Sequence, residues 1–249
     1  HLHSIPRLPE AIPYVTSYYK ENWGFCLSQK DREKLKNGIY EVFIDSSLFD
    51  GHLSYGELVI EGYSKKEIFL STYICHPLMA NDGLSGPAVT TFLSKWLTSL
   101  KTKKYTHRVV FIPETIGSLV YLNKHLKHLK KHVIAGFNIT CIGDDRAYSY
   151  LPSREGNTLS DKVANHVLSS LDKNFLSYEW SDRGSDERQY CAPLVNLPIA
   201  SIYRSKIAKY DEYHTSLDDL ENVVTSKGLL GGYQAIKLAL EAIEQNGYP

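Results

Sequence analysis

The sequence lacks the features that define several large classes of protein. Lys and Arg together number 28, as do Asp and Glu, so the formal net charge is zero. Proteins that bind nucleic acid by neutralising phosphates need a basic excess. No apolar run approaches the roughly 20 residues of a membrane-spanning helix, and no G-x-G-x-x-G motif follows the first apolar strand-like run. We therefore expect a soluble protein with no nucleic-acid partner, no membrane span and no nucleotide-binding motif of that type.

Cysteine is scarce and scattered. The four cysteines, Cys26, Cys75, Cys141 and Cys191, form no CxxC pair, which argues against a zinc ribbon and against a disulfide framework. Cys75 and Cys141 each lie in an apolar run, which predicts buried free thiols. Because reduced thiols are typical of the cytoplasm, we expect a cytoplasmic protein.

Two kinds of pattern divide the chain. Its 249 residues are 43% hydrophobic and 22% charged, enough for one large domain or a domain with a small companion. Residues 38–49 and 56–62 alternate apolar with polar side chains, as half-exposed strands do. Thereafter apolar runs over 67–77, 107–113, 132–143 and 197–203 alternate with helical spacing over 86–100, 117–129, 158–171 and 226–244. This order predicts an α/β domain with a mixed sheet between two layers of helices.

Metal-binding residue types stand where the predicted buried strands end. In open α/β sheets ligands bind beyond the carboxyl ends of the strands. His76 and Asp82 follow the first buried strand, Glu114 follows the second, and His214 lies in a late polar segment. Imidazoles and carboxylates are ligands that zinc accepts. Their occurrence at one predicted edge of the sheet indicates a metal site.

Each of these residues also has a purely structural interpretation. His76 fits a strand-end histidine bonded to a carbonyl group, and Asp82 fits a cap of the following helix. Glu114 fits a first-turn carboxylate that complements a helix dipole. His214 fits a solvated loop histidine, with the TSLDD segment after it as a helix cap followed by first-turn acids.

Two short motifs resemble those of co-catalytic zinc aminopeptidases. The segment from His76 through AND to Ser85-Gly86 resembles their "H…AND-x-x-SG" signature, in which the histidine binds one metal and the aspartate bridges two. The segment YHTSLDD resembles their late "HTxxD" motif, whose histidine, here His214, is another ligand. The match runs from about residue 56 to the C-terminus and implies a three-layer α/β/α domain of the zinc-exopeptidase type.

The whole chain is also similar to the aminopeptidase-like proteins of bacterial surface-polysaccharide clusters. The shared sequence segments include PYVTSYY, WGFCLS, STYICHP, FIPETIGS, GDDRAYSYLPSR and DRGSDERQY. That resemblance implies that residues 1–55 are the C-terminal part of an inserted β-rich accessory subdomain, with further sequence before His1. Residues 56–249 would then be the zinc aminopeptidase-like domain.

The sequence departs from the peptidases at two ligand positions. They carry two adjacent glutamates, whereas Pro113-Glu114-Thr115 supplies one carboxylate. Where they carry an aspartate in an "N-x-D" strand end, this chain carries Thr140. The resemblance therefore favours one zinc ion, on His76, Asp82 and His214, over two, since three protein ligands and a water are usual for catalytic zinc.

These expectations lead to a zinc-dependent hydrolase of amide bonds, with Glu114 as catalytic base or, failing that, as a fourth ligand. Asp186, Glu187, Arg183 and Arg188 are candidates to hold charged groups of a peptide, amino-sugar or other small-molecule substrate. A de-N-acylase of an amino sugar is one variant of this function. The alternative is a binding or scaffold module that keeps the peptidase fold without its chemistry.

Overall fold

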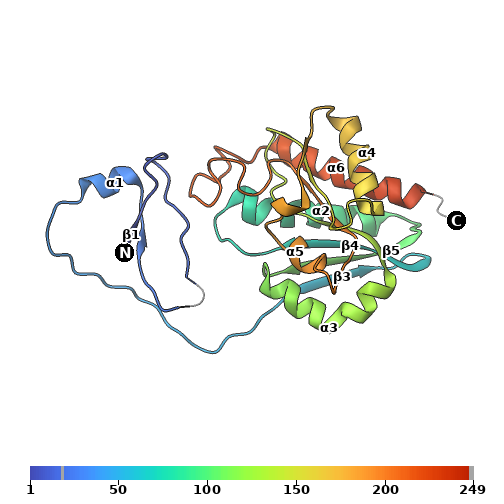
Figure 1. The fold of residues 1–249 in the computed structure, drawn as a ribbon, viewed down its shortest axis with the longest axis horizontal. Helices are drawn as coiled ribbons and strands as arrows, with labels where there is room; N and C mark the ends of the chain where they lie inside the picture. Colours follow the sequence, from blue (N-terminus) through green and yellow to red (C-terminus); the bar gives the residue numbers. More distant parts are fainter. Residues whose placement is uncertain (18–19, 247–249) are drawn as a thin grey trace.

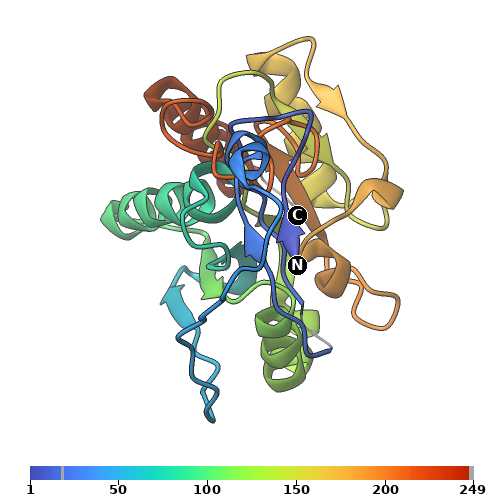
Figure 2. The same ribbon diagram turned by 90° about the vertical axis from the view of Figure 1, so that its left-hand side faces the viewer.

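The computed structural model describes residues 1–17 and 20–246. The N-terminal segment, up to about residue 55, lies beside the α/β domain and crosses in front of it when viewed from that side (Figures 1 and 2). It contains little regular structure, namely β1 (Leu2–His3), β2 (Phe25–Cys26) and α1 (Gln29–Lys34). Two-residue strands β1 and β2 pair in parallel.

A seven-stranded mixed sheet forms the centre of the molecule, in the order β3-β5-β4-β6-β9-β7-β8. β4, β5, β6 and β9 run parallel, whereas β3 pairs antiparallel with β5 and β7 pairs antiparallel with β9. The central strands are buried on both faces, which explains their continuous apolar runs. The strands are β3 (Gly56–Ile60), β4 (Ser64–Tyr73), β5 (Tyr105–Ile112), β6 (Val133–Asn138), β7 (Ser149–Leu151), β8 (Leu176–Ser177) and β9 (Ile199–Tyr203).

Helices cover both faces of this sheet, so the domain has three layers, as predicted (Figure 1). α2 (Gly86–Ser99), α4 (Leu159–Leu171) and α6 (Ser226–Gln245) pack together on one face, and α3 (Ile116–His132) and α5 (Glu187–Tyr190) lie on the other. Apolar residues three and four apart, such as Val163 and Val167 of α4, enter the core. A capping box between Thr158 and Asp161 begins α4.

The prediction of a strand over residues 38–49 is wrong. This segment has no regular structure, and its Ile39, Phe43 and Leu48 side chains are 104%, 85% and 101% exposed. Alternation predicts a strand only where a neighbouring strand can pair with it, and none of the described residues does so here. The expected strand over 56–62 is confirmed as β3, which pairs with β5 at the edge of the main sheet.

Candidate metal site

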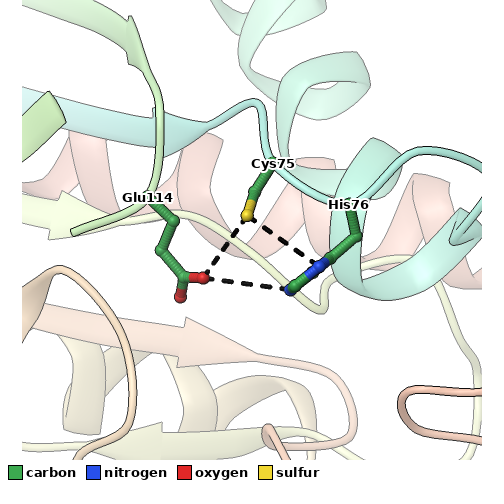
Figure 3. A group of neighbouring side chains, drawn as sticks. All are labelled: Cys75, His76 and Glu114. Atoms are coloured by element: carbon green, nitrogen blue, oxygen red, sulfur yellow. Dashed lines mark hydrogen bonds and ion pairs between the residues drawn. The ribbon is translucent and has the colours of Figure 1, made fainter. Parts of the chain in front are cut away.

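Loops after two adjacent strands bring His76 and Glu114 together. His76 follows β4, Glu114 follows β5, and the two strands pair in parallel. The His76 Nε2 atom lies 3.9 Å from Glu114 Oε2. Cys75 joins them, with its Sγ atom 3.7 Å from Glu114 Oε2 and 3.9 Å from His76 Nδ1 (Figure 3). Cys75 is half-buried, so the prediction of a buried thiol is wrong for this residue and correct for Cys141.

Asp82 completes a tighter group with the two histidines. Its Oδ2 atom lies 3.2 Å from His76 Nε2 and 3.0 Å from His214 Nε2. Asp82 belongs to the π-helical turn η1 (Ala80–Ser85) that begins α2, and such turns are frequent at functional sites. The described residues contain two clusters that could hold a metal ion, His76–Asp82–His214 and Cys75–His76–Glu114, and these clusters share His76.

The group has the properties of an ion site. Asp82 Oδ2 and His214 Nε2 are buried and lack a hydrogen-bond partner, although buried polar atoms are normally paired. Two imidazole nitrogens and a carboxylate oxygen are ligands for zinc, and atoms about 2.0–2.2 Å from one ion lie near 3.3 Å from each other in a tetrahedron. The residues present therefore fit one zinc ion.

The other oxygen of Asp82 faces protein donors. Tyr73 donates its hydroxyl hydrogen to Asp82 Oδ1 at 2.5 Å, and the Cys141 thiol lies 3.6 Å from the same atom. Thr140 in turn donates to the Tyr73 hydroxyl at 2.6 Å. Burial alone would raise the pKa of Asp82, but the contact with His214, the hydrogen bond from Tyr73 and the charge of His76 hold it below its ordinary value.

The loop that carries His214 also holds the turn that carries Asp82. Asp218 accepts hydrogen bonds from the backbone N–H groups of Asn81, at 2.7 Å, and Asp82, at 3.0 Å. The interpretation of the TSLDD segment as a helix start is therefore wrong, since no helix forms there and Asp218 caps η1 instead. This link fixes the positions of two of the three candidate ligands, Asp82 and His214, relative to each other.

Backbone strain is concentrated around these residues. Leu78, Thr115, Cys141 and His214 all have positive φ angles, of 70°, 62°, 45° and 55°. Each such conformation costs about 1–3 kcal/mol in a residue other than glycine. Strain of this kind persists where the surroundings impose it, which is common at functional sites.

The structural alternatives for His76 and Asp82 do not fit the contacts of these two residues. Among residues 1–17 and 20–246, no carbonyl group accepts a hydrogen bond from His76 and no side chain caps α2, so Asp82 does not act as its cap. Glu114 points towards Cys75 and His76, with its side chain 20% exposed. Burial raises the pKa of Glu114, and the Asp82 charge adds to the effect. A raised pKa increases the affinity of this carboxylate for a proton, which favours a role as a base.

The four predicted substrate-binding residues fall into two pairs. Asp186 and Glu187 are completely buried, whereas Arg183 and Arg188 are exposed. Asp186 Oδ1 accepts hydrogen bonds from the Thr115 backbone N–H group at 2.7 Å and from the Ser118 hydroxyl at 2.9 Å. Asp186 thus supports the backbone directly after Glu114.

Glu187 holds its own loop. Its Oε1 atom accepts from the N–H groups of Gly184 and Ser185, and its Oε2 atom accepts from Asn138. The Arg183 guanidinium group lies over the Trp180 ring at the surface. A role for any of the four residues in binding substrate stays a prediction.

Three neighbours of the site were not predicted as functional. Tyr73 has the position of an ordinary core residue in a strand, and Cys75 was expected only as a buried thiol. Tyr14 lies more than sixty residues before His76, yet its ring contacts those of His76 and His214. Only the strand-end position of Cys75, next to His76, was a usable signal in the sequence.

A family model described as a domain of unknown function, DUF4910, matches residues 4–246. The chain belongs to this family. A protein of Clostridium acetobutylicum is 44% identical to this DUF4910 chain over 246 residues, which are 99% of the chain and 56% of the relative. The name of that relative refers to polysaccharide biosynthesis and to an aminopeptidase-like domain. The resemblance to this group is therefore confirmed.

Several solved structures have a similar fold. A crystal structure from Clostridium acetobutylicum, named as a peptidase, has a TM-score of 0.93 and 43% identity, over 98% of this chain and 57% of that one. BSAP, a zinc aminopeptidase from Bacillus subtilis, has a TM-score of 0.63 and 15% identity over 76% and 49% of the two chains. A glutaminyl cyclase from Porphyromonas gingivalis has a TM-score of 0.63 and 12% identity over 77% and 78%.

These comparisons confirm the α/β fold of the aminopeptidase type. At 15% and 12% identity, the enzymes from Bacillus subtilis and Porphyromonas gingivalis show the fold alone. The DUF4910 chain spans slightly more than half of the length of its two more similar relatives. No helix among residues 1–17 and 20–246 is long and apolar enough to cross a membrane.

Proposed function

We propose that this chain is a hydrolase of amide bonds that binds one zinc ion on His76, Asp82 and His214. The observation that carries the proposal is the pair of buried atoms, Asp82 Oδ2 and His214 Nε2, that point at each other without a hydrogen bond. An ion between them and His76 Nε2 satisfies all three atoms. Without one, the carboxylate and the imidazoles are in contact at 3.0 and 3.2 Å, but the buried Asp82 Oδ2 and His214 Nε2 atoms form no hydrogen bond of good geometry, which is costly for buried polar atoms.

One ion is favoured over two by the state of Asp82. A bridging aspartate gives one oxygen to each metal, but Asp82 Oδ1 already accepts a hydrogen bond from the Tyr73 hydroxyl group. Thr140, which donates to Tyr73, contributes a neutral hydroxyl group where a second ion needs a charged ligand.

The chemistry of the chain centres on Glu114. When bound, zinc lowers the pKa of a water molecule to about 7 and polarises a carbonyl group. Glu114, beside His76 at the open end of β5, accepts the proton of the attacking water and delivers it to the leaving amine. Its raised pKa increases its affinity for that proton. Asp186 holds the backbone of Thr115 and so fixes the direction of the Glu114 side chain.

The substrate is an amide of a peptide or an amino sugar. The relative from Clostridium acetobutylicum, with its reference to polysaccharide biosynthesis, supports the amino sugar, which makes removal of an N-acyl group the favoured reaction. The four free cysteines support a reducing, cytoplasmic location.

Metal content and hydrolysis together test this function. The purified protein is analysed for zinc per chain and then assayed on aminoacyl nitroanilides and on N-acetylated sugars, with and without a chelator. We expect one zinc ion per chain and hydrolysis on one panel that the chelator abolishes. Tight zinc with no turnover on either panel contradicts the hydrolase and favours the binding module.

A further inference from the structure

The N-terminal segment reaches the metal site and is tied to it by its backbone. The Tyr14 N–H group donates to the carbonyl oxygen of His214 at 2.8 Å, and the Ser216 N–H group donates to the carbonyl oxygen of Ile12 at 2.9 Å. The Ile12 N–H group donates to the Ser216 hydroxyl oxygen at 3.0 Å. Ala11, directly before this stretch, is completely buried. Residues far apart in sequence thus form one short ladder beside a metal ligand.

This ladder places the Tyr14 ring against both histidines of the site. The ring centroids of Tyr14 and His76 are 4.8 Å apart at an angle of 77°, and those of Tyr14 and His214 are 5.5 Å apart at 70°. The two imidazoles are themselves 4.6 Å apart. Edge-to-face contacts of this kind are favourable, so the phenol ring is held by packing as well as by its backbone.

The ring packs on the more exposed side of the cluster. Asp82, only 1% exposed, reaches the ligand cluster from the interior. The His214 side chain is 34% exposed and marks the outward side of the cluster, and Tyr14, half-buried, packs against it there. A group bound beside the ion from outside therefore meets the Tyr14 ring.

We propose that Tyr14 is a specificity-determining residue that contacts the acyl group of the substrate and limits its size. The inference rests on the proposed function, because it assigns the acyl side of the scissile amide to the space beside Tyr14. The phenol ring offers an apolar face, its main chain is held by the bond to His214, and its packing against the two imidazoles opposes displacement by a longer acyl chain. Acyl groups of acetyl size pass this ring, whereas longer linear ones collide with it.

The selectivity for acyl groups of different length tests whether Tyr14 limits the size of the acyl group. Parent protein and Tyr14→Ala are assayed for kcat and KM on N-acetyl-, N-butyryl- and N-hexanoyl-glucosamine. We expect the ratio of kcat/KM for the hexanoyl to that for the acetyl substrate to rise by about tenfold or more in Tyr14→Ala, within the range of a few methylene groups in an apolar pocket. Tyr14→Phe keeps the ring and should keep the parent ratio.

Tyr63→Ala is the matched control, since Tyr63 is 82% exposed on the turn between β3 and β4. It should leave the ratio unchanged. A parent-like ratio in Tyr14→Ala overturns the inference, as does a loss of kcat alone with no change in the ratio, because that result belongs to a residue that only packs the histidines.

Two measurements that need no turnover separate this inference from the proposed function. In zinc-loaded protein, Tyr14→Ala should keep the parent stoichiometry but release zinc to a chelator about tenfold faster, the lower end of the effect of a residue that supports ligands. In metal-free protein, diethylpyrocarbonate should modify His76 and His214 faster in Tyr14→Ala, as followed by peptide mapping.

A parent protein that binds no zinc contradicts the proposed function, and the modification rates then still report on Tyr14. Equal modification rates in parent and Tyr14→Ala show that the ring does not cover the histidines and overturn the inference. Faster modification with an unchanged acyl ratio also overturns it, because Tyr14 then shields the site without selecting the substrate.

Discussion

Tyr73 donates its hydroxyl hydrogen to Asp82 Oδ1 at 2.5 Å, so that the two oxygens of one carboxylate have different partners. Oδ1 faces hydroxyl and thiol groups of the interior, and Oδ2 faces the imidazoles of His76 and His214. A hydrogen bond of this kind fixes the orientation of a metal-binding carboxylate and tunes its affinity. The Tyr73 hydroxyl group therefore occupies the carboxylate oxygen, Oδ1, that a second ion would need.

The first prediction concerns that hydrogen bond. Tyr73→Phe removes the donor and keeps the ring, so Asp82 loses its orientation and zinc affinity should fall by about tenfold or more. Zinc per chain at saturation should stay at one. Competition with a chromophoric chelator measures the affinity, and Tyr121→Phe is the control, because Tyr121 is also buried and bonds to Glu57 far from the ligands. Two zinc ions per parent chain contradict the interpretation of Tyr73.

The second prediction concerns the histidine ligands. His76→Ala and His214→Ala each leave an incomplete set of ligands, so zinc affinity should fall by orders of magnitude. Because a tightly bound ion stabilises the native state by mass action, the zinc-dependent rise in melting temperature should disappear as well. His166→Ala, on the exposed face of α4, should behave like the parent. Stoichiometric zinc in either ligand variant shows that the ion is held elsewhere.

The fold was largely predictable because its main elements have strong periodicity. The expected helix over 158–171 and the observed α4, Leu159–Leu171, differ by one residue. The short elements β7, β8 and α5 were not predicted, since segments of two to four residues carry no detectable period. The alternation of residues 38–49 predicted a strand that does not form, because pairing depends on a neighbour that local sequence does not specify.

The site was predictable to the extent that it lies at strand ends. His76, Asp82, Glu114 and His214 gather as the residue types and the sheet order indicated. The partners that orient them come from a buried strand position, Tyr73, and from other distant parts of the chain. Such residues carry no local signal, because only the tertiary structure decides which side chains meet.

The third prediction concerns Glu114 as the general base. Glu114→Gln keeps the size of the side chain and its hydrogen bonds but cannot accept a proton, so turnover should fall by about 10²–10⁴. Zinc content should stay at the parent value, since the three ligands are untouched. If zinc and turnover fall together, Glu114 is a ligand. Unchanged turnover, measured as kcat on the substrate that the parent hydrolyses, refutes the mechanism.

The last prediction concerns Asp186 and pH. Burial raises the pKa of Asp186 to about 7, although Thr115 and Ser118 donate hydrogen bonds to it. Between about pH 4 and about pH 7 the native state therefore holds a proton that the unfolded state has lost, and the free energy of unfolding decreases as pH rises through this range.

Asp186→Asn should remove this contribution, which is at most about 4 kcal/mol for a shift of three pKa units. Denaturant unfolding of both proteins, from about pH 4.5 to about pH 8, measures it. The difference between parent and variant isolates Asp186 from Glu114 and Asp218, whose pKa values are also raised. Asp211→Asn, with a side chain 76% exposed, should follow the parent at every pH. If Asp186→Asn follows it too, Asp186 is ionised throughout this range, and a charged carboxylate supports the backbone behind Glu114.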